Sequence, residues 1–232
     1  MNIIEIKGIC KTYDKKTIPV HALNGIDLTF QEGEFAAIVG PSGSGKTTLL
    51  NIMGGLDEPS EGVILIDGIN ITELSGRKKT QFRMKNIGFV FQSFNLIPVF
   101  TVKENIEFIM QLQGKLKGER EKRTNELLSS VGLNDKKNSR PNKLSGGQQQ
   151  RVAVARALAS KPKFILADEP TANLDSKSTE NLLDIMEKLN KEENITFIFS
   201  THDARVMNKA RRIITIEDGK VIEDILKEKS TL

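Results

Sequence analysis

The sequence predicts an α/β fold with three parts: a core with a mostly parallel sheet, an N-terminal antiparallel β subdomain, and an inserted α-helical subdomain. Three observations support this prediction. Residues 3–7 and 26–30 alternate apolar and polar side chains, residues 101–131 show helical periodicity, and apolar strands separated by a helix follow. Because a strand–helix–strand order implies crossover connections, we expect the core strands to run parallel.

Two further strand signals lie in the first third of the chain. Within residues 34–39, the five residues after Glu34 form a continuous apolar run that suits a strand buried on both faces. Residues 63–66 lead through Asp67-Gly68 into residues 69–71. Asp-Gly between apolar runs indicates a hairpin, because both turn residues tolerate a positive φ.

The middle of the chain predicts helices, because apolar residues recur at helical spacing in residues 101–131. Two faces are expected, Val102, Ile106 and Ile109 on one and Leu127, Leu128 and Val131 on the other. We therefore expect a single domain over residues 1–232. Its β and core part covers about residues 1–91 and 146–232, and the helical insertion covers about residues 92–145.

The C-terminal part predicts more strands of the parallel sheet. Residues 164–167 and 195–200 carry strand signals, and a helix is expected between them. The apolar face of that helix consists of Leu182, Ile185, Met186 and Leu189. Residues 213–216 and 221–222 flank a second Asp-Gly turn and predict a last hairpin.

The composition is typical of a soluble globular chain. Its 232 residues carry 34 Lys+Arg and 30 Asp+Glu, a formal net charge of +4, and the 38% hydrophobic residues argue against disorder. No apolar stretch approaches the roughly 18 residues that span a bilayer, and no secretory signal is visible. The single Cys10 cannot form an internal disulfide. We therefore expect a cytoplasmic protein.

The basic clusters at residues 115–123 and 136–140 also contain or adjoin acidic residues. This mixture favours an ordinary solvated surface, with a nucleic-acid or anionic-lipid face as the alternative. No nucleic-acid partner is expected.

Residues 40–47 carry the pattern G-x-x-x-x-G-K-[ST] between a buried strand and a helical run, a pattern typical of nucleotide-binding phosphate loops. Its glycines let backbone N–H groups surround a phosphate, and the helix directs its positive end at the same anion. Lys46 can reach the β- and γ-phosphates, and the Thr47 hydroxyl can bind Mg²⁺. The alternative is a Gly-Ser turn without a ligand. The expected phosphate-binding residues are Gly40, Ser42, Gly43, Ser44, Gly45, Lys46, Thr47 and Thr48.

Asp168 and Glu169 follow the expected strand at residues 164–167. Successive residues at a strand end point in opposite directions, so the two carboxylates can take two roles. Asp168 would position Mg²⁺, and Glu169 would orient and deprotonate an attacking water molecule. The alternative is a surface acidic pair that ends a strand.

Leu144-Ser145-Gly146-Gly147-Gln148 stands before another helical run. A serine and two glycines at a helix start form a second anion site. One nucleotide needs only one phosphate loop, so this second element is explained if two chains meet head-to-tail. Each chain would then present Ser145, Gly146, Gly147 and Gln148 to the γ-phosphate held by the other.

With these motifs in this order, the chain resembles the nucleotide-binding subunits of ATP-binding cassette (ABC) transporters over about residues 3–224. Residues 40–47 match the family's Walker A loop, Asp168 and Glu169 its Walker B pair, and residues 144–148 its signature. The resemblance implies a P-loop NTPase core, ATP and Mg²⁺ as ligands, and a homodimer in the ATP-bound state. It also implies integral membrane permease subunits as partners and a peripheral location on the cytoplasmic face of the plasma membrane.

The resemblance implies four more site residues. Tyr13 matches the aromatic ring that stacks on adenine, Gln92 the Q-loop glutamine that reaches the metal and hinges the insertion, Asp175 the D-loop, and His202 the switch histidine that contacts the γ-phosphate. The implied catalytic set is thus Glu169, His202, Lys46 and Gln92. Alternatives stay open: Tyr13 as a half-buried strand-end ring, Gln92 as an ordinary loop amide, and His202 as a core histidine.

Residues 20–25, 54–59, 91–98 and 166–171 are similar to the branch that includes the LolD, MacB and FtsE ATPases. This similarity implies lipoprotein release or macrolide or peptide export, with FtsE-like control of a cell-wall hydrolase at division as the alternative. A soluble nucleic-acid or ribosome ATPase is the remaining alternative. Ala172 departs from the branch, which usually has glycine there, and its methyl group is expected to restrict the loop.

The apolar residues Leu96, Ile97, Val99 and Phe100 suit a contact with the membrane subunits, and packing on the insertion's own helices is the alternative.

Overall fold

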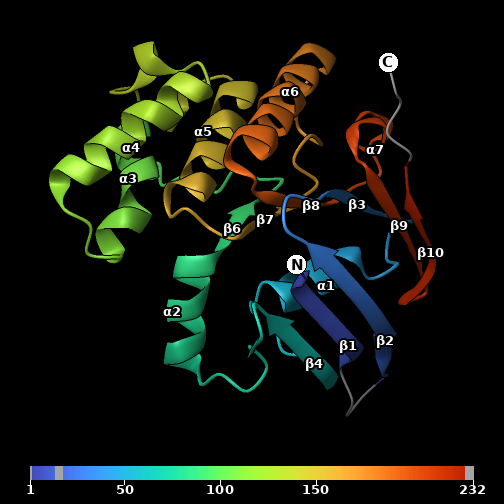
Figure 1. Cartoon of the computed structure of the whole chain (residues 1–232). Helices are drawn as coiled ribbons and strands as arrows, with labels where there is room; N and C mark the ends of the chain where they lie inside the picture. Colours follow the sequence, from blue (N-terminus) through green and yellow to red (C-terminus); the bar gives the residue numbers. More distant parts are fainter. Residues whose placement is uncertain (1, 14–17, 228–232) are drawn as a thin grey trace.

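The computed structural model describes residues 2–13 and 18–227, which form two sheets with helices around them (Figure 1). Within these ranges the N-terminal strands make a four-stranded antiparallel sheet in the order β2-β1-β4-β5. Its strands are β1 (Asn2–Tyr13), β2 (Val20–Gln31), β4 (Glu61–Ile66) and β5 (Ile69–Asn70). The predicted antiparallel β subdomain is therefore confirmed.

The turn between β4 and β5 is Asp67-Gly68, as predicted. Their φ angles of 51° and 73° are the left-handed values that a two-residue hairpin needs. β1 and β2 are much longer than the sequence pattern predicts, because register shifts along β1 interrupt the alternation of apolar and polar residues.

The core strands form a six-stranded sheet in the order β10-β9-β3-β8-β7-β6, again counted over the described ranges. Every pair of neighbours is parallel except β10 with β9, which confirms the mostly parallel sheet. The strands are β3 (Phe35–Val39), β6 (Ile87–Val90), β7 (Phe164–Asp168), β8 (Thr196–Ser200), β9 (Arg212–Glu217) and β10 (Lys220–Leu226).

The helices lie between and around these strands. Their bounds are α1 (Lys46–Met53), α2 (Gly76–Asn86), α3 (Val102–Leu112), α4 (Lys117–Ser130), α5 (Gly146–Ala159), α6 (Ser176–Glu193) and α7 (Ala204–Lys209), with short 3-10 turns at Asn134–Lys136 and Pro141–Lys143. The sequence pattern did not predict α2, β6 or α7. α2 carries almost no apolar residues, β6 has four residues and α7 has six, so none of them shows a clear period.

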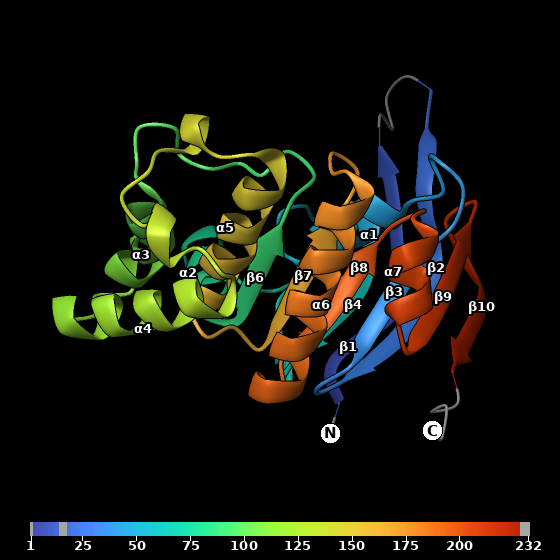
Figure 2. The ribbon, with the colours of Figure 1, turned by 90° about the horizontal axis from the view of Figure 1, so that it is seen from above.

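The parallel sheet is buried on both faces. Ala36 and Ile38 of β3 pack into a cluster with β1, β2, β4 and α1, whereas Phe35, Ala37 and Val39 pack into a cluster with α3, α4, α5 and α6. This alternation gives three layers: the antiparallel sheet with α1, the parallel sheet, and the helices (Figure 1). Seen from above, α5 and α6 lie over the parallel sheet (Figure 2). The continuous apolar run of β3 is explained by burial on both sides.

The helical insertion shares its core with the parallel sheet. Val102 and Ile106 of α3 and Leu127 and Leu128 of α4 belong to the same buried cluster as Phe197 of β8. α3 begins at a capping box in which the Thr101 hydroxyl accepts from the Glu104 N–H and the Glu104 carboxylate accepts from the Thr101 N–H. None of the helices in the described ranges is long and apolar enough to cross a membrane.

Replacing Phe35 by alanine is expected to destabilise the fold by about 3–5 kcal/mol, because its ring is fully buried. Phe35 packs against Phe197 and Phe199, with ring centroids 5.7 Å and 4.8 Å away. Urea denaturation followed by circular dichroism measures the loss. Phe108→Ala is the matched control, because Phe108 is 37% exposed and should cost less than half as much. Equal losses would contradict this description of the core.

Candidate active site

The phosphate loop joins the end of β3 to the start of α1, as predicted. Two of its glycines cannot be replaced without moving the backbone. Gly40 has φ 145°, and a Cβ there would lie 2.0 Å from the Ile216 carbonyl oxygen; Gly45 has φ 103°, and its Cβ would lie 2.4 Å from the Ala22 carbonyl oxygen. The loop is therefore packed closely against β9 and β2.

Lys46 lies at the first position of α1 and directs its side chain back into the loop. Its Nζ donates hydrogen bonds to the Gly40 carbonyl at 2.9 Å and the Pro41 carbonyl at 2.8 Å. The side chain of Ser44 is also buried beneath the loop. The loop thus holds an ammonium group beside its own backbone at the positive end of a helix, an arrangement suited to phosphate.

Thr47 and Asp168 lie together, although 121 residues separate them in the sequence. The Thr47 hydroxyl donates to Asp168 Oδ1 at 3.1 Å, and this contact links α1 to the end of β7. A hydroxyl and a carboxylate oxygen are hard ligands of the kind that Mg²⁺ prefers, so these two residues fit a magnesium site. Gln92 is exposed and lines a cleft together with Thr47, so it is a third candidate ligand. Bound there, Mg²⁺ would offset the negative charge of the phosphates.

Glu169 is held between β7 and β8 in an unusual conformation. Its φ of 45° is left-handed, a strained value for a residue with a side chain, and its N–H donates to the Ser200 carbonyl at 2.9 Å. The carboxylate accepts from the Thr201 hydroxyl at 3.3 Å and lies 2.7 Å from His202 Nδ1. Since an ionised carboxylate only accepts, a proton on Nδ1 fits this contact.

His202 is not a core histidine, because 76% of its side chain is exposed. That alternative is wrong. Gln92 is exposed as well, and Tyr13 lies at the exposed end of β1. Their predicted roles toward a nucleotide remain predictions.

A cleft of about 800 Å³ collects most of the predicted residues. Those that line it are Tyr13, Gly40, Ser42, Gly43, Gly45, Lys46, Thr47, Thr48, Gln92, Glu169 and His202. Ala172 also lines the cleft and is exposed, so its methyl group meets no crowded loop here. One chain therefore brings the phosphate loop, the candidate base and the aromatic ring to a single opening.

The signature residues lie apart from this cleft. Ser145 caps α5: its hydroxyl accepts from the Gln148 N–H at 3.3 Å, while the Gln148 side chain accepts from the Ser145 N–H at 2.9 Å. Ser145, Gly147 and Gln148 line a separate hollow of about 260 Å³ with Lys177. Asp175 caps α6 by accepting from the Ser178 N–H at 2.9 Å. The structure thus does not join the two predicted phosphate-binding elements within one chain.

Sequence reasoning missed one side chain that lines the cleft and one that lies next to a residue of the cleft. His21 lines it beside Tyr13 and is fixed by the Thr12 hydroxyl, 3.1 Å from its Nδ1. The register of the β1–β2 hairpin pairs Thr12 with His21, so that register was the available signal. Asp203, next to His202, accepts a hydrogen bond of 2.9 Å from the Thr171 hydroxyl. This bond links the loop after β8 to the loop after β7. Nothing in the local sequence indicated that contact.

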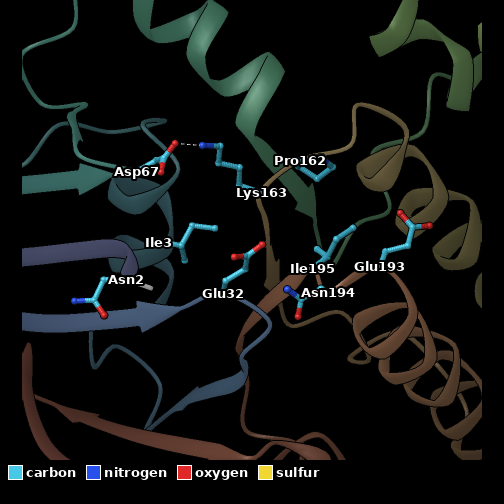
Figure 3. Close-up of a pocket in the computed structure, with 9 residues that line it drawn as sticks. All are labelled: Asn2, Ile3, Glu32, Asp67, Pro162, Lys163, Glu193, Asn194 and Ile195. Atoms are coloured by element: carbon cyan, nitrogen blue, oxygen red, sulfur yellow. Dashed lines mark hydrogen bonds and ion pairs between the residues drawn. The ribbon is translucent and has the colours of Figure 1, made fainter.

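Another hollow lies where β7 and β8 begin, at the edge of the parallel sheet opposite the cleft (Figure 3). Glu32, Asn194 and the ion-paired Asp67 and Lys163 are among its lining residues. It contains none of the predicted site residues.

The fold and the cleft together define a nucleotide-hydrolysing protein with a phosphate loop. A family model described as "ABC transporter" matches residues 23–172, and the chain belongs to this family. It is the ATP-binding subunit of an ABC transporter and an ATP hydrolase.

Three relatives illustrate the similarity. An uncharacterized ABC transporter ATP-binding protein of Methanocaldococcus jannaschii is 48% identical over 223 residues, covering 94% of this chain and 95% of that protein. A solved dimeric, post-hydrolysis structure of that archaeal cassette with ADP and Pi has a TM-score of 0.89 at 44% identity, covering 97% and 99%. The lipoprotein-releasing system ATP-binding protein LolD 1 of Rhodopseudomonas palustris is 46% identical over 222 residues, covering 95% and 98%. The macrolide export ATP-binding/permease protein MacB of Campylobacter jejuni is 44% identical over 228 residues, covering 98% of this chain and 35% of that protein.

Asp203, next to His202, is expected to make the stability of the fold sensitive to acid. Hydrogen bonds from Arg205, opposed by partial burial, lower the pKa of Asp203 from 3.8 to about 2, and the Thr171 hydroxyl contributes. A carboxyl whose folded pKa is depressed stabilises the fold above its unfolded pKa and loses that contribution as the pH falls toward the folded value. Asp203→Asn should therefore be less stable than the parent at pH 6, and the gap should narrow between pH 4 and pH 2. Urea midpoints across this range measure the gap; a gap that widens on acidification would contradict the assignment.

Proposed function

We propose that two copies of this ATPase close around two Mg-ATP molecules and drive integral membrane permease subunits. One observation carries the proposal: the two elements that the sequence predicts to bind phosphate open into separate hollows. Each hollow holds only part of the groups expected around a γ-phosphate. A second copy of the chain would supply the missing groups to each hollow.

The geometry of a symmetric pair supports this assembly. In a two-fold dimer the contact of one copy with the other is repeated in reverse, so both nucleotides would be enclosed at once. The exposed start of α5 would face the cleft of the other copy, and Ser145, Gly147 and the helix N-terminus would meet the phosphate held by Lys46. The solved structure of the Methanocaldococcus jannaschii relative is dimeric and holds ADP and Pi, which supports assembly as a dimer.

Several residues at and beside the cleft would then bind the nucleotide or act in its hydrolysis. Glu169 would orient and deprotonate the attacking water, and His202, already paired with it, would contact the γ-phosphate. Lys46 would bind the β- and γ-phosphates, and Tyr13 would stack on adenine. Thr47, Asp168 and Gln92 would hold Mg²⁺. Because the γ-phosphate is the group that both copies touch, its removal would let the dimer open.

The permease would contact the helical insertion near residues 94–100. A groove of about 290 Å³ there is lined by Phe89, Phe91, Phe108 and Leu112 among others. Val99, in the same segment of the chain, is 69% exposed. Leu96, by contrast, packs against the buried cluster, and Phe100 packs on Phe108. Leu96 and Phe100 thus take part in internal packing, and a contact with the permease would use exposed side chains such as Val99. Such a contact would keep the protein peripheral, on the cytoplasmic face of the membrane.

The branch of the family indicates the task. The similarity to LolD and MacB favours lipoprotein release or export of macrolides or peptides. FtsE-like control of cell-wall hydrolysis would use the same ATP cycle, so the two roles differ only in the attached membrane protein. Purification of the complex from native membranes, followed by identification of that protein, separates them.

Glu169→Gln should bind Mg-ATP without hydrolysing it and accumulate as a dimer. Light scattering after gel filtration measures the mass, which should double with Mg-ATP and stay that of the monomer with Mg-ADP. The neutral amide removes the base but leaves the phosphate contacts in place.

Glu192→Gln is the matched control, since Glu192 is an exposed residue of α6 that pairs with Lys188. It should hydrolyse ATP like the parent and show no trapped dimer. A Glu169→Gln chain that binds Mg-ATP yet remains monomeric at high concentration would contradict the proposed assembly.

A further inference from the structure

The hydroxyl of Tyr13 is anchored to an aspartate far away in the sequence. It donates a hydrogen bond of 2.6 Å to Oδ2 of Asp57, which lies in the loop between α1 and β4. Partial burial is the larger cause and this hydrogen bond the next of a raised pKa of Tyr13, so the phenol keeps its proton at neutral pH. The contact therefore joins the end of β1, where the ring meets the cleft, to the loop that leaves α1.

The carboxylate of Asp57 is itself fixed on its other oxygen. Oδ1 accepts from Lys11 Nζ at 2.7 Å and from the Glu58 N–H at 2.7 Å. Although partial burial opposes it, the hydrogen bonds from Lys11 and Tyr13 lower the pKa of Asp57, so the group is ionised at neutral pH. Lys11 also donates to the Glu58 carbonyl at 2.7 Å. The anchor of Tyr13 is thus a charged and well-connected group.

Lys11 also covers one face of the Tyr13 ring. Its Nζ lies over the ring, 4.6 Å from the centroid, while only 12% of its side chain is exposed. A cation in this position is attracted to the π face and occupies it. The ring lines the cleft together with Thr48 and the phosphate loop. A ligand base would stack on the face of the ring opposite Lys11.

We propose that Lys11 and Asp57 are positioning residues that hold Tyr13 as a one-sided stacking platform for the nucleotide base. The inference rests on the proposed function, in which the base stacks on Tyr13. A ring tethered at its hydroxyl and backed by Lys11 is already ordered before the nucleotide binds. Ordering a free side chain on binding weakens affinity by about three- to tenfold, and the tether removes that loss.

The rival explanation is that Lys11 and Asp57 merely fasten the loop after α1 to β1. The two explanations differ in which ligands they affect. A platform matters only to a ligand that carries a base, whereas a loosened loop would also disturb the phosphate site at the other end of α1. Inorganic tripolyphosphate with Mg²⁺ has the phosphates and no base, so it separates them.

The test uses Tyr13→Phe, Asp57→Asn and Lys11→Met in the full chain. Steady-state kinetics give KM and kcat for ATP, and competition gives the inhibition constant of tripolyphosphate. Tyr13→Phe keeps the ring and removes only the tether. We expect KM to rise about three- to tenfold in each variant, with kcat and the inhibition constant unchanged within about twofold.

Asp67→Asn is the matched control, because it breaks another aspartate–lysine pair, with Lys163, in the hollow of Figure 3. It should leave all three constants unchanged. A parental KM in Tyr13→Phe would overturn the inference, and so would a tripolyphosphate constant that weakens in step with KM. Failure of tripolyphosphate to compete in the parent chain would instead contradict the proposed phosphate site, and the inference with it.

Discussion

The carboxyl ends of β3, β7 and β8 meet at one edge of the parallel sheet, and the site depends on this meeting. β3 ends in the phosphate loop, β7 in Asp168 and Glu169, and β8 in Thr201 and His202. The hydrogen-bond ladder continues past the strand ends, from the Thr201 N–H to the Ile38 carbonyl at 3.1 Å and from the Glu169 N–H to the Ser200 carbonyl at 2.9 Å. Parallel strands thus fix, through backbone bonds alone, the relative positions of groups that lie far apart in sequence.

A second constraint concerns α5, which carries the signature residues. For two copies to enclose two nucleotides, the signature of each chain must sit at a set distance from that chain's own phosphate loop. Gln150 is fully buried on α5 and donates to the Pro170 carbonyl at 2.8 Å and the Phe91 carbonyl at 3.3 Å. Arg156, six residues further along α5, donates to the Phe94 and Asn95 carbonyls. These bonds fasten α5 to the segments that follow β6 and β7, so the signature is held in register with the sheet edge.

The sequence predicted those parts of the molecule whose signals are local. Asp67-Gly68 needs only its own backbone to make a hairpin, and Phe35–Val39 shows its burial in its own composition. The polar helix α2 gave no such signal, because it is only slightly buried and its one buried side chain is Lys79. The exposure of His202 depends on where β8 ends, and the contact between Tyr13 and Asp57 spans 44 residues. Such facts come from tertiary packing, which no single window of the sequence contains.

The central claim is that each nucleotide site is built from two chains, and mixing two inactive variants tests it most directly. Ser145→Arg blocks the signature and keeps the phosphate loop, whereas Lys46→Ala does the reverse. Each variant alone should hydrolyse ATP very slowly, but a mixed dimer has one complete site. Equimolar mixing should therefore restore turnover toward about a quarter of the parent rate, since half of the dimers are mixed and each has one good site of two. A mixture no faster than the sum of its separate components would contradict the account.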